Sequence, residues 1–170
     1  MSLLMTLLIV AAANIKYNIY SKTWSNDATI KDELDMPLYF VDFKKSFTGS
    51  WTVKFQEHTA DAITIDKGAT SNAKIVDLES GFSTYLLKSG LTTRTFEFRA
   101  QDDKTYVWKS TGFTGNMKMY HVYNQKVVLA FFSGSTLTIH ESLADMKKII
   151  LATGFAAARW DREHYFPYNR

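Results

Sequence analysis

The sequence predicts a mainly β protein, an antiparallel closed β-barrel of about 10–12 strands around one apolar C-terminal helix. Between Ile15 and Ile139, short stretches rich in β-branched and aromatic residues alternate with turn residues. Aromatic residues make up 15% of the chain, including 12 Phe and 9 Tyr, and these residue types favour strands. Residues 149–158 carry no charge, which predicts a helix that is apolar on every side.

The N-terminal segment, residues 1–14, is apolar, and residues 1–13 contain no charged side chain. It is too short to span a bilayer, which takes about 20 apolar residues. Two interpretations follow. The segment is either a first element packed on the barrel or a signal peptide, which would have small residues at its end but lacks the usual basic start. A chain of 170 residues is otherwise the size of one domain, so we expect residues 15–170 to form a single barrel domain.

The strands are expected to follow one another as an antiparallel meander, because no helical segment of 10–15 residues separates them. Trp51, Val53 and Phe55 alternate with polar residues, as in a strand with one buried face. The expected strands are 15–23, 28–31, 37–43, 51–56, 62–66, 73–78, 82–87, 95–100, 105–110, 117–123, 126–132 and 136–139.

The helix is expected at about 142–163, with Ser142 as its N-cap and Asp145 in its first turn. Its apolar part of ten residues is about 15 Å long, half of a bilayer core. Gly154 and the surrounding alanines keep it thin, and charged residues stand at both ends. These features indicate a plug inside a barrel, with Ile149, Ile150, Thr153 and Ala157 buried.

Several segments resemble the tubby C-terminal-like superfamily, which includes the tubby proteins, the LURP-one-related proteins and the phospholipid scramblases. The segment ATIKDELDMPLYFVDF is similar to their early hairpin. The segments YVWK and LTIHESLADMKKIILATGF, and the hairpin around Asn124, look like an uncharacterised fungal branch. The resemblance spans residues 26–163 and implies a barrel around a central helix, with a tendency to bind lipids or protein partners. It implies no site, because the cysteines and acidic run of the scramblases are absent and the phosphoinositide-binding pair of the tubby proteins has no matching positions.

Catalytic and metal-binding motifs are absent from the sequence. The chain has no cysteine, and its four histidines, His58, His121, His140 and His164, lack metal-ligand spacing. There is no nucleophile elbow and no phosphate-binding glycine loop. We therefore expect no catalytic residue, no metal and no cofactor.

Basic side chains are the candidate binding residues. Residues 81–170 contain 12 basic and 7 acidic side chains, whereas residues 1–80 contain 8 and 10. Bases flank both ends of the expected helix, and a further pair follows an aromatic strand. A basic side chain near an anionic bilayer contributes about 1 kcal/mol of binding free energy. The candidates are Lys147, Lys148, Arg159, Arg162, Lys44 and Lys45.

The expected function is therefore that of a non-enzymatic binding domain. Its partners are expected to be anionic lipid headgroups, including phosphoinositides, or a protein, with no nucleic acid and no transmembrane span. We expect a cytoplasmic monomer that attaches peripherally to membranes, or a secreted protein if residues 1–13 are a signal peptide. Two alternatives are a lipocalin-like carrier of a small apolar ligand, which needs an open barrel, and a hydrolase whose site assembles in space.

Overall fold

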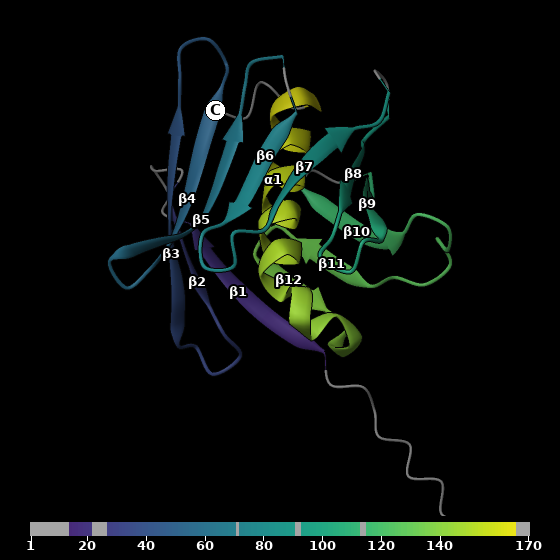
Figure 1. Ribbon diagram of the computed structural model, residues 1–170, viewed down its shortest axis with the longest axis horizontal. Coiled ribbons are helices and arrows are strands. Elements are labelled where there is room, and N and C mark those ends of the chain that lie inside the picture. Colours follow the sequence, from purple (N-terminus) through teal and green to yellow (C-terminus); the bar gives the residue numbers. More distant parts are fainter. Residues whose placement is uncertain (1–13, 22–26, 71, 91–92, 113–114, 166–170) are drawn as a thin grey trace, which may run out of the picture.

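The computed structural model describes residues 14–21, 27–70, 72–90, 93–112 and 115–165, with side chains up to Glu163. The expectations for residues 1–13 lie outside the described residues. The described chain forms twelve strands that close into an antiparallel barrel, in which β1 pairs with both β2 and β12 (Figure 1). This confirms the predicted fold class.

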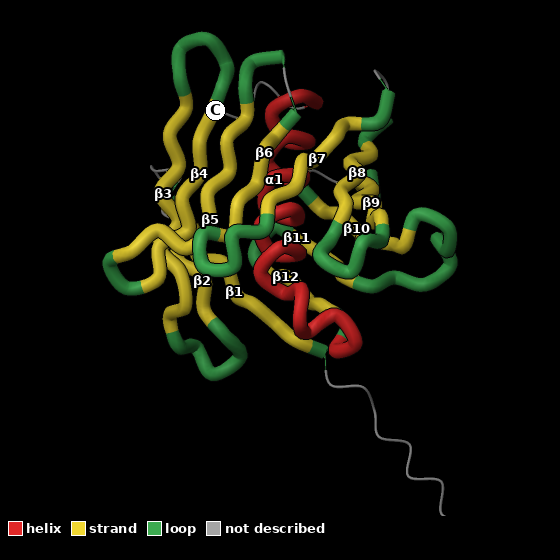
Figure 2. Tube along the Cα trace, viewed as in Figure 1, coloured by secondary structure: helices red, strands yellow, loops and turns green. Residues whose placement is uncertain are grey.

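Each strand pairs with the strands that precede and follow it in the chain, all the way around the barrel (Figure 2). Eleven of them lie within a few residues of their predicted ranges. They are β1 Ile15–Ser21, β2 Ala28–Lys31, β3 Pro37–Lys45, β4 Trp51–Glu57, β5 Ala60–Lys67, β6 Ala73–Asp77, β7 Ser83–Lys88, β8 Thr95–Arg99, β9 Thr105–Ser110, β10 Asn116–His121, β11 Ala130–Ser133 and β12 Thr136–Ile139.

The loop between β10 and β11 is longer than predicted, because β11 begins at Ala130 and not at Lys126. After His121 the chain turns, with an isolated bridge between His121 and Asn124 and a hydrogen bond from the Lys126 amide to Asn124 Oδ1. The expected tight hairpin at Asn124 is therefore a local turn within a wider loop.

The C-terminal helix α1, Lys147–Tyr165, runs through the interior of the barrel (Figure 1). Ile149, Thr153 and Ala157 have no exposed surface and Ile150 is 1% exposed, as predicted. The Trp108 indole Nε1 donates to Thr153 Oγ1 at 3.0 Å, which satisfies the polar atoms of both side chains inside the apolar core.

The start of the helix differs from the prediction. A 3-10 helix, η1 Glu141–Met146, precedes α1, and its N-cap is His140 and not Ser142. The His140 imidazole Nδ1 accepts the backbone N–H of Ser142, so Ser142 is a capped residue and not the cap. Leu143 has non-helical dihedral angles, φ −107° and ψ 17°, which introduce a kink within η1 before the regular helix begins at Lys147.

The barrel has two ends with different loops. We call the end at which α1 starts the amino mouth; it is formed by the β2–β3, β4–β5, β6–β7, β8–β9 and β10–β11 connections and by η1. We call the end at which α1 finishes the carboxyl mouth; it is formed by the β1–β2, β3–β4, β5–β6, β7–β8, β9–β10 and β11–β12 connections.

Candidate anion-binding site at the carboxyl mouth

Basic side chains from strands far apart in the sequence face the helix at the carboxyl mouth. Lys45 of β3 and Lys67 of β5 both pair directly with Trp51 of β4, which is 1% exposed. Lys88 of β7 pairs with Phe96, which is fully buried. Because directly opposed residues share a face of the sheet, these lysines point into the barrel at its edge. We call the inner rim the set Lys45, Lys67, Lys88 and Arg94.

Arg94 lies just before β8 and connects the rim to the helix. Its Nε and Nη2 donate to the two carboxylate oxygens of Asp161 at 2.7 and 2.6 Å. Asp161 has no exposed surface, and the Arg94 side chain is 20% exposed. A bidentate arginine of this kind is the usual way in which a buried carboxylate is kept charged. The pair therefore fixes the end of α1 against the strand wall.

The second acidic residue of the helix end, Glu163, is also engaged. Its Oε1 accepts Lys45 Nζ at 3.3 Å and Arg159 Nε at 3.2 Å. The Arg159 guanidinium also lies 4.0 Å from the centre of the Phe43 ring. Burial lowers the pKa of Arg159 below its usual value, and the Glu163 carboxylate opposes that shift. Both acids of the helix end, Asp161 and Glu163, are thus held by specific bases.

Lys67 differs from its neighbours because it is buried and, in the part of the chain that the structure describes, has no carboxylate at ion-pair distance. Its side chain is 7% exposed, donates to the Gly68 carbonyl at 2.7 Å and lies 4.4 Å from the centre of the Trp160 ring. Among the described residues no carboxylate forms an ion pair with it. Desolvation by burial lowers the pKa of Lys67 from its usual 10.5, and Glu163 partly offsets this effect. The ammonium therefore keeps donor capacity at the mouth of the barrel.

Trp51, which pairs with Lys67 on the neighbouring strand, also has a hydrogen-bond donor without an acceptor among the described residues. Trp51 Nε1 is buried and, within the described part of the chain, has no hydrogen-bond partner. Unpaired buried donors are rare in folded proteins and mark places where a water molecule or a ligand is bound. Lys67 and Trp51 together therefore indicate a site for an acceptor, and the surrounding positive charge favours an anion.

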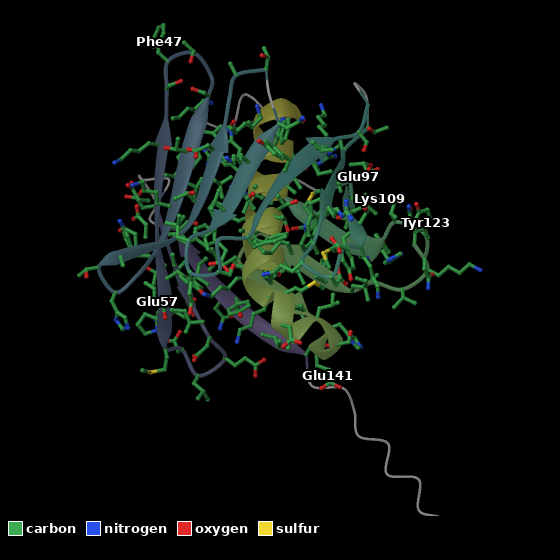
Figure 3. All side chains as sticks on the ribbon, in the orientation of Figure 1. Phe47, Glu57, Glu97, Lys109, Tyr123 and Glu141 are labelled. Atoms are coloured by element: carbon green, nitrogen blue, oxygen red, sulfur yellow. The ribbon has the colours of Figure 1, made fainter. Side chains whose placement is uncertain are left out.

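The amino mouth has the opposite charge. Its loops and η1 carry many acids, and Figure 3 labels two of them, Glu57 and Glu141, at that end of the barrel. The acids in the described residues there are Asp32, Glu33, Asp35, Glu57, Asp77, Glu79, Asp102, Asp103, Glu141 and Asp145. The bases there are fewer: Lys31, Arg99, Lys104, Lys126, Lys147 and Lys148. The molecule is therefore electrically polar along the barrel axis.

This division separates the six candidate residues of the sequence. Lys147 and Lys148 lie at the acidic amino mouth, where Lys148 forms an ion pair with Glu79 that raises the pKa of the lysine. At the carboxyl mouth, Arg159 and Lys45 share Glu163, and Arg162 lies against Gly115 of the β9–β10 connection. Lys44 pairs with Thr52, points outward and contacts Asp42 at 3.2 Å.

Three rim residues, Lys67, Lys88 and Arg94, were not among the candidates. A signal for two of them was present, since Lys67 continues the inward alternation of Ile63 and Ile65, and Lys88 that of Leu86. A base in the inward register at the end of a strand faces the lumen of a barrel. Only the strand order shows that these bases meet at one mouth.

The histidines and acids of the described residues do not gather into a metal site. Within the described residues, no cluster of three or more His, Asp or Glu side chains is arranged to hold a metal ion. His58 is in a turn, His121 ends β10 and His140 caps η1, whereas the side chain of His164 lies outside the described residues. No helix in the described part has the length and hydropathy needed to cross a bilayer.

Comparison with known proteins gives a likeness in fold alone. No protein-family model matches the chain, and no curated protein matches its sequence. The X-ray structure of a protein from Arabidopsis thaliana superposes with a TM-score of 0.55 at 10% sequence identity. The superposition covers 86% of this chain and 93% of the plant protein, so it includes nearly the whole barrel and helix.

Proposed function

We propose that the chain is a non-enzymatic binding domain that attaches peripherally to anionic membranes through its carboxyl mouth. The observation that carries this proposal is the inner rim, with the buried Lys67 that has no carboxylate partner in the described residues. Burial of an unpaired ammonium costs free energy, so a protein retains one where an anion is to be bound. The negative oxygens of a lipid headgroup provide such an anion.

The strength of this attachment is expected to be modest and salt-dependent. Basic residues near an anionic bilayer contribute about 1 kcal/mol each, and Lys45 and Arg159 are already shared with Glu163. The Debye length falls from about 10 Å at 0.1 M salt to about 3 Å at 1 M, so the attraction is lost over that range. Reversible binding at a cytoplasmic membrane surface by a monomer fits these values.

The resemblance to the tubby C-terminal-like superfamily supports the same proposal. The closed barrel around a C-terminal helix is the plan of that superfamily, whose members are associated with lipids and with protein partners. The carrier alternative is less well supported, because buried residues of α1, such as Ile149 and Leu151, occupy the interior that an apolar ligand would need. A hydrolase would need a catalytic group at the mouth, and the bases there are placed to hold anions.

The test is vesicle sedimentation with two variants matched in charge. Lys45→Gln/Arg162→Gln removes two positive charges at the carboxyl mouth, and Lys147→Gln/Lys148→Gln removes two at the amino mouth. With phosphatidylserine-containing vesicles at low salt, we expect the first variant to bind about 5- to 30-fold more weakly; the lower figure applies where Glu163 already neutralises Lys45, and the upper where both charges contribute about 1 kcal/mol. The second variant should bind like the wild type.

Two results would contradict the proposal. Equal losses in the two variants would show that net charge alone matters, with no role for the carboxyl mouth. Failure of the wild type to sediment with any anionic vesicle, while it still unfolds cooperatively, would make a protein the better candidate partner.

A further inference from the structure

A phenylalanine stands fully exposed at the tip of the β3–β4 hairpin, beside the inner rim. Phe47 has a relative exposure of 108%, and Figure 3 shows it at the far end of the hairpin, away from the barrel. Ser46 alone separates it from Lys44 and Lys45 in the sequence, and the hairpin belongs to the carboxyl mouth. An aromatic ring is thus presented beyond a pair of lysines.

The hairpin holds this ring outward by a well-bonded turn. The Ser46 amide donates to the Ser50 carbonyl at 2.8 Å, and Gly49, with φ +85°, donates back to the Ser46 carbonyl at 3.3 Å. The hydroxyls of Ser46 and Ser50 are 2.6 Å apart, and the Thr48 hydroxyl joins them at 2.8 Å from Ser46. The turn brings the hydroxyls of Ser46, Thr48 and Ser50 together and leaves the Phe47 ring exposed to solvent.

Single exposed apolar residues are common, so exposure alone indicates little. What distinguishes Phe47 is its place. The similarly exposed Leu34, at 83%, and Tyr123, at 91%, lie in loops of the acidic amino mouth, where an anionic surface is repelled. Phe47 lies at the opposite end, where basic side chains attract one.

We propose that Phe47 inserts into the headgroup region of an anionic bilayer and orients the barrel with its carboxyl mouth on the membrane. This inference rests on the function proposed above and adds the depth and direction of the attachment. Lys44 and Lys45 then lie at the level of the headgroups, with the ring below them, as in interfacial anchors that combine bases and aromatics. The acidic amino mouth is directed away from the surface.

The orientation is tested with single fluorescent labels, because the chain has no cysteine of its own. A polarity-sensitive dye is attached at Thr48→Cys, beside Phe47, and at Glu33→Cys, beside Leu34 at the amino mouth. The bond between Ser46 and Ser50 remains in the first variant. With phosphatidylserine vesicles, the dye at position 48 should shift to the blue and become protected from aqueous quenchers, and the dye at position 33 should not.

The contribution of the ring is measured with substitutions at both mouths. Phe47→Ser should weaken vesicle binding by about tenfold or more, since the gain from burying a phenyl ring is lost, while Phe47→Leu should retain most of it. Tyr123→Ser, its matched control, should bind like the wild type. Because Phe47 is fully exposed, neither Phe47→Ser nor Phe47→Leu should change the midpoint of unfolding.

The outcomes separate the two proposals. Suppose that the wild type sediments with anionic vesicles, but the dye at position 48 stays in water or Phe47→Ser binds as well as the wild type. The insertion of Phe47 is then refuted, and the proposal that the carboxyl mouth binds anionic membranes is retained. If the wild type does not sediment with them, both proposals are overturned.

Discussion

Gly154 of α1 is expected to be the position where the barrel tolerates least additional volume. A Cβ placed there would lie 2.8 Å from Trp108 Cζ2, 3.0 Å from Trp108 Cη2 and 3.5 Å from Phe132 Cδ2. Carbon atoms in contact prefer about 3.5–4.0 Å. Trp108 has no exposed surface, and its Nε1 is bound to Thr153 of the same helix, so its indole cannot retreat freely.

The magnitude follows from two opposing effects in the variant Gly154→Ala. Alanine in a helix interior is favoured over glycine by about 1 kcal/mol. Overpacking of a close-packed core costs about 1–3 kcal/mol. We therefore expect a net loss of about 1 kcal/mol of unfolding free energy for alanine, and a loss of about 3 kcal/mol or more for Gly154→Leu, which adds three further carbons.

The assay is urea unfolding followed by circular dichroism, with Trp108→Phe as the partner variant in a double-mutant cycle. Phenylalanine lacks the outer indole atoms that meet the new Cβ, so in that background Gly154→Ala should become neutral or stabilising. A coupling free energy of about 1 kcal/mol or more is expected between the two positions. If Gly154→Ala stabilises the wild-type protein by about 1 kcal/mol, the indole retreats and the steric reasoning is refuted.

Two further substitutions test the charges of the carboxyl mouth. Arg94→Met leaves the buried Asp161 carboxylate without its bidentate partner and should cost about 3–5 kcal/mol in chemical unfolding; a cost near zero would show that water replaces the arginine. Lys67→Met should raise the unfolding free energy at pH 7 by about 1 kcal/mol, reduced by the cation–π contact with Trp160 that the variant loses. The same variant should bind vesicles more weakly. The pKa of Lys67 in the folded protein lies below 10.5, so the unfolded state binds more protons than the folded state as the pH rises from that folded pKa toward 10.5. The wild type therefore has the full free-energy cost of the buried charge at neutral pH and loses it over that interval. The stability advantage of methionine should shrink over the same interval. An advantage that grows with pH would contradict this assignment.

The barrel was predictable because its signals are local. The alternation of Trp51, Val53 and Phe55 fixes which face of β4 is buried, and a helix without charges from 149 to 158 has to be enclosed. The start of the helix was not predictable in the same way. It depends on the His140 side chain accepting a backbone N–H and on the dihedral angles of Leu143, and neither is written in the hydrophobic pattern.

The site was predictable only in part, because its composition depends on which strand ends meet. Counting bases near the helix finds Arg159 and Arg162, but it also selects Lys147 and Lys148, whose surroundings are acidic through loops distant in the sequence. Lys67 shows the opposite case. It looks like an ordinary strand-end lysine until the pairing with Trp51 and the position of α1 place it inside the barrel.

The two acids at the end of α1 connect the plug to the binding surface. Acids in the last turns of a helix are unfavourable beside the negative end of its dipole, so Asp161 and Glu163 have to be stabilised by other contacts. Arg94 holds the first, and Lys45 with Arg159 holds the second. Because Arg94 and Lys45 belong to different parts of the barrel wall, the same contacts that seat the helix also fix these two rim cations in place. Both carboxylates are in direct contact with other bases, and Lys67, beside Trp160, has no ion pair at contact distance among the described residues. The seating of the plug therefore leaves a buried ammonium, that of Lys67, which an external anion is well placed to neutralise.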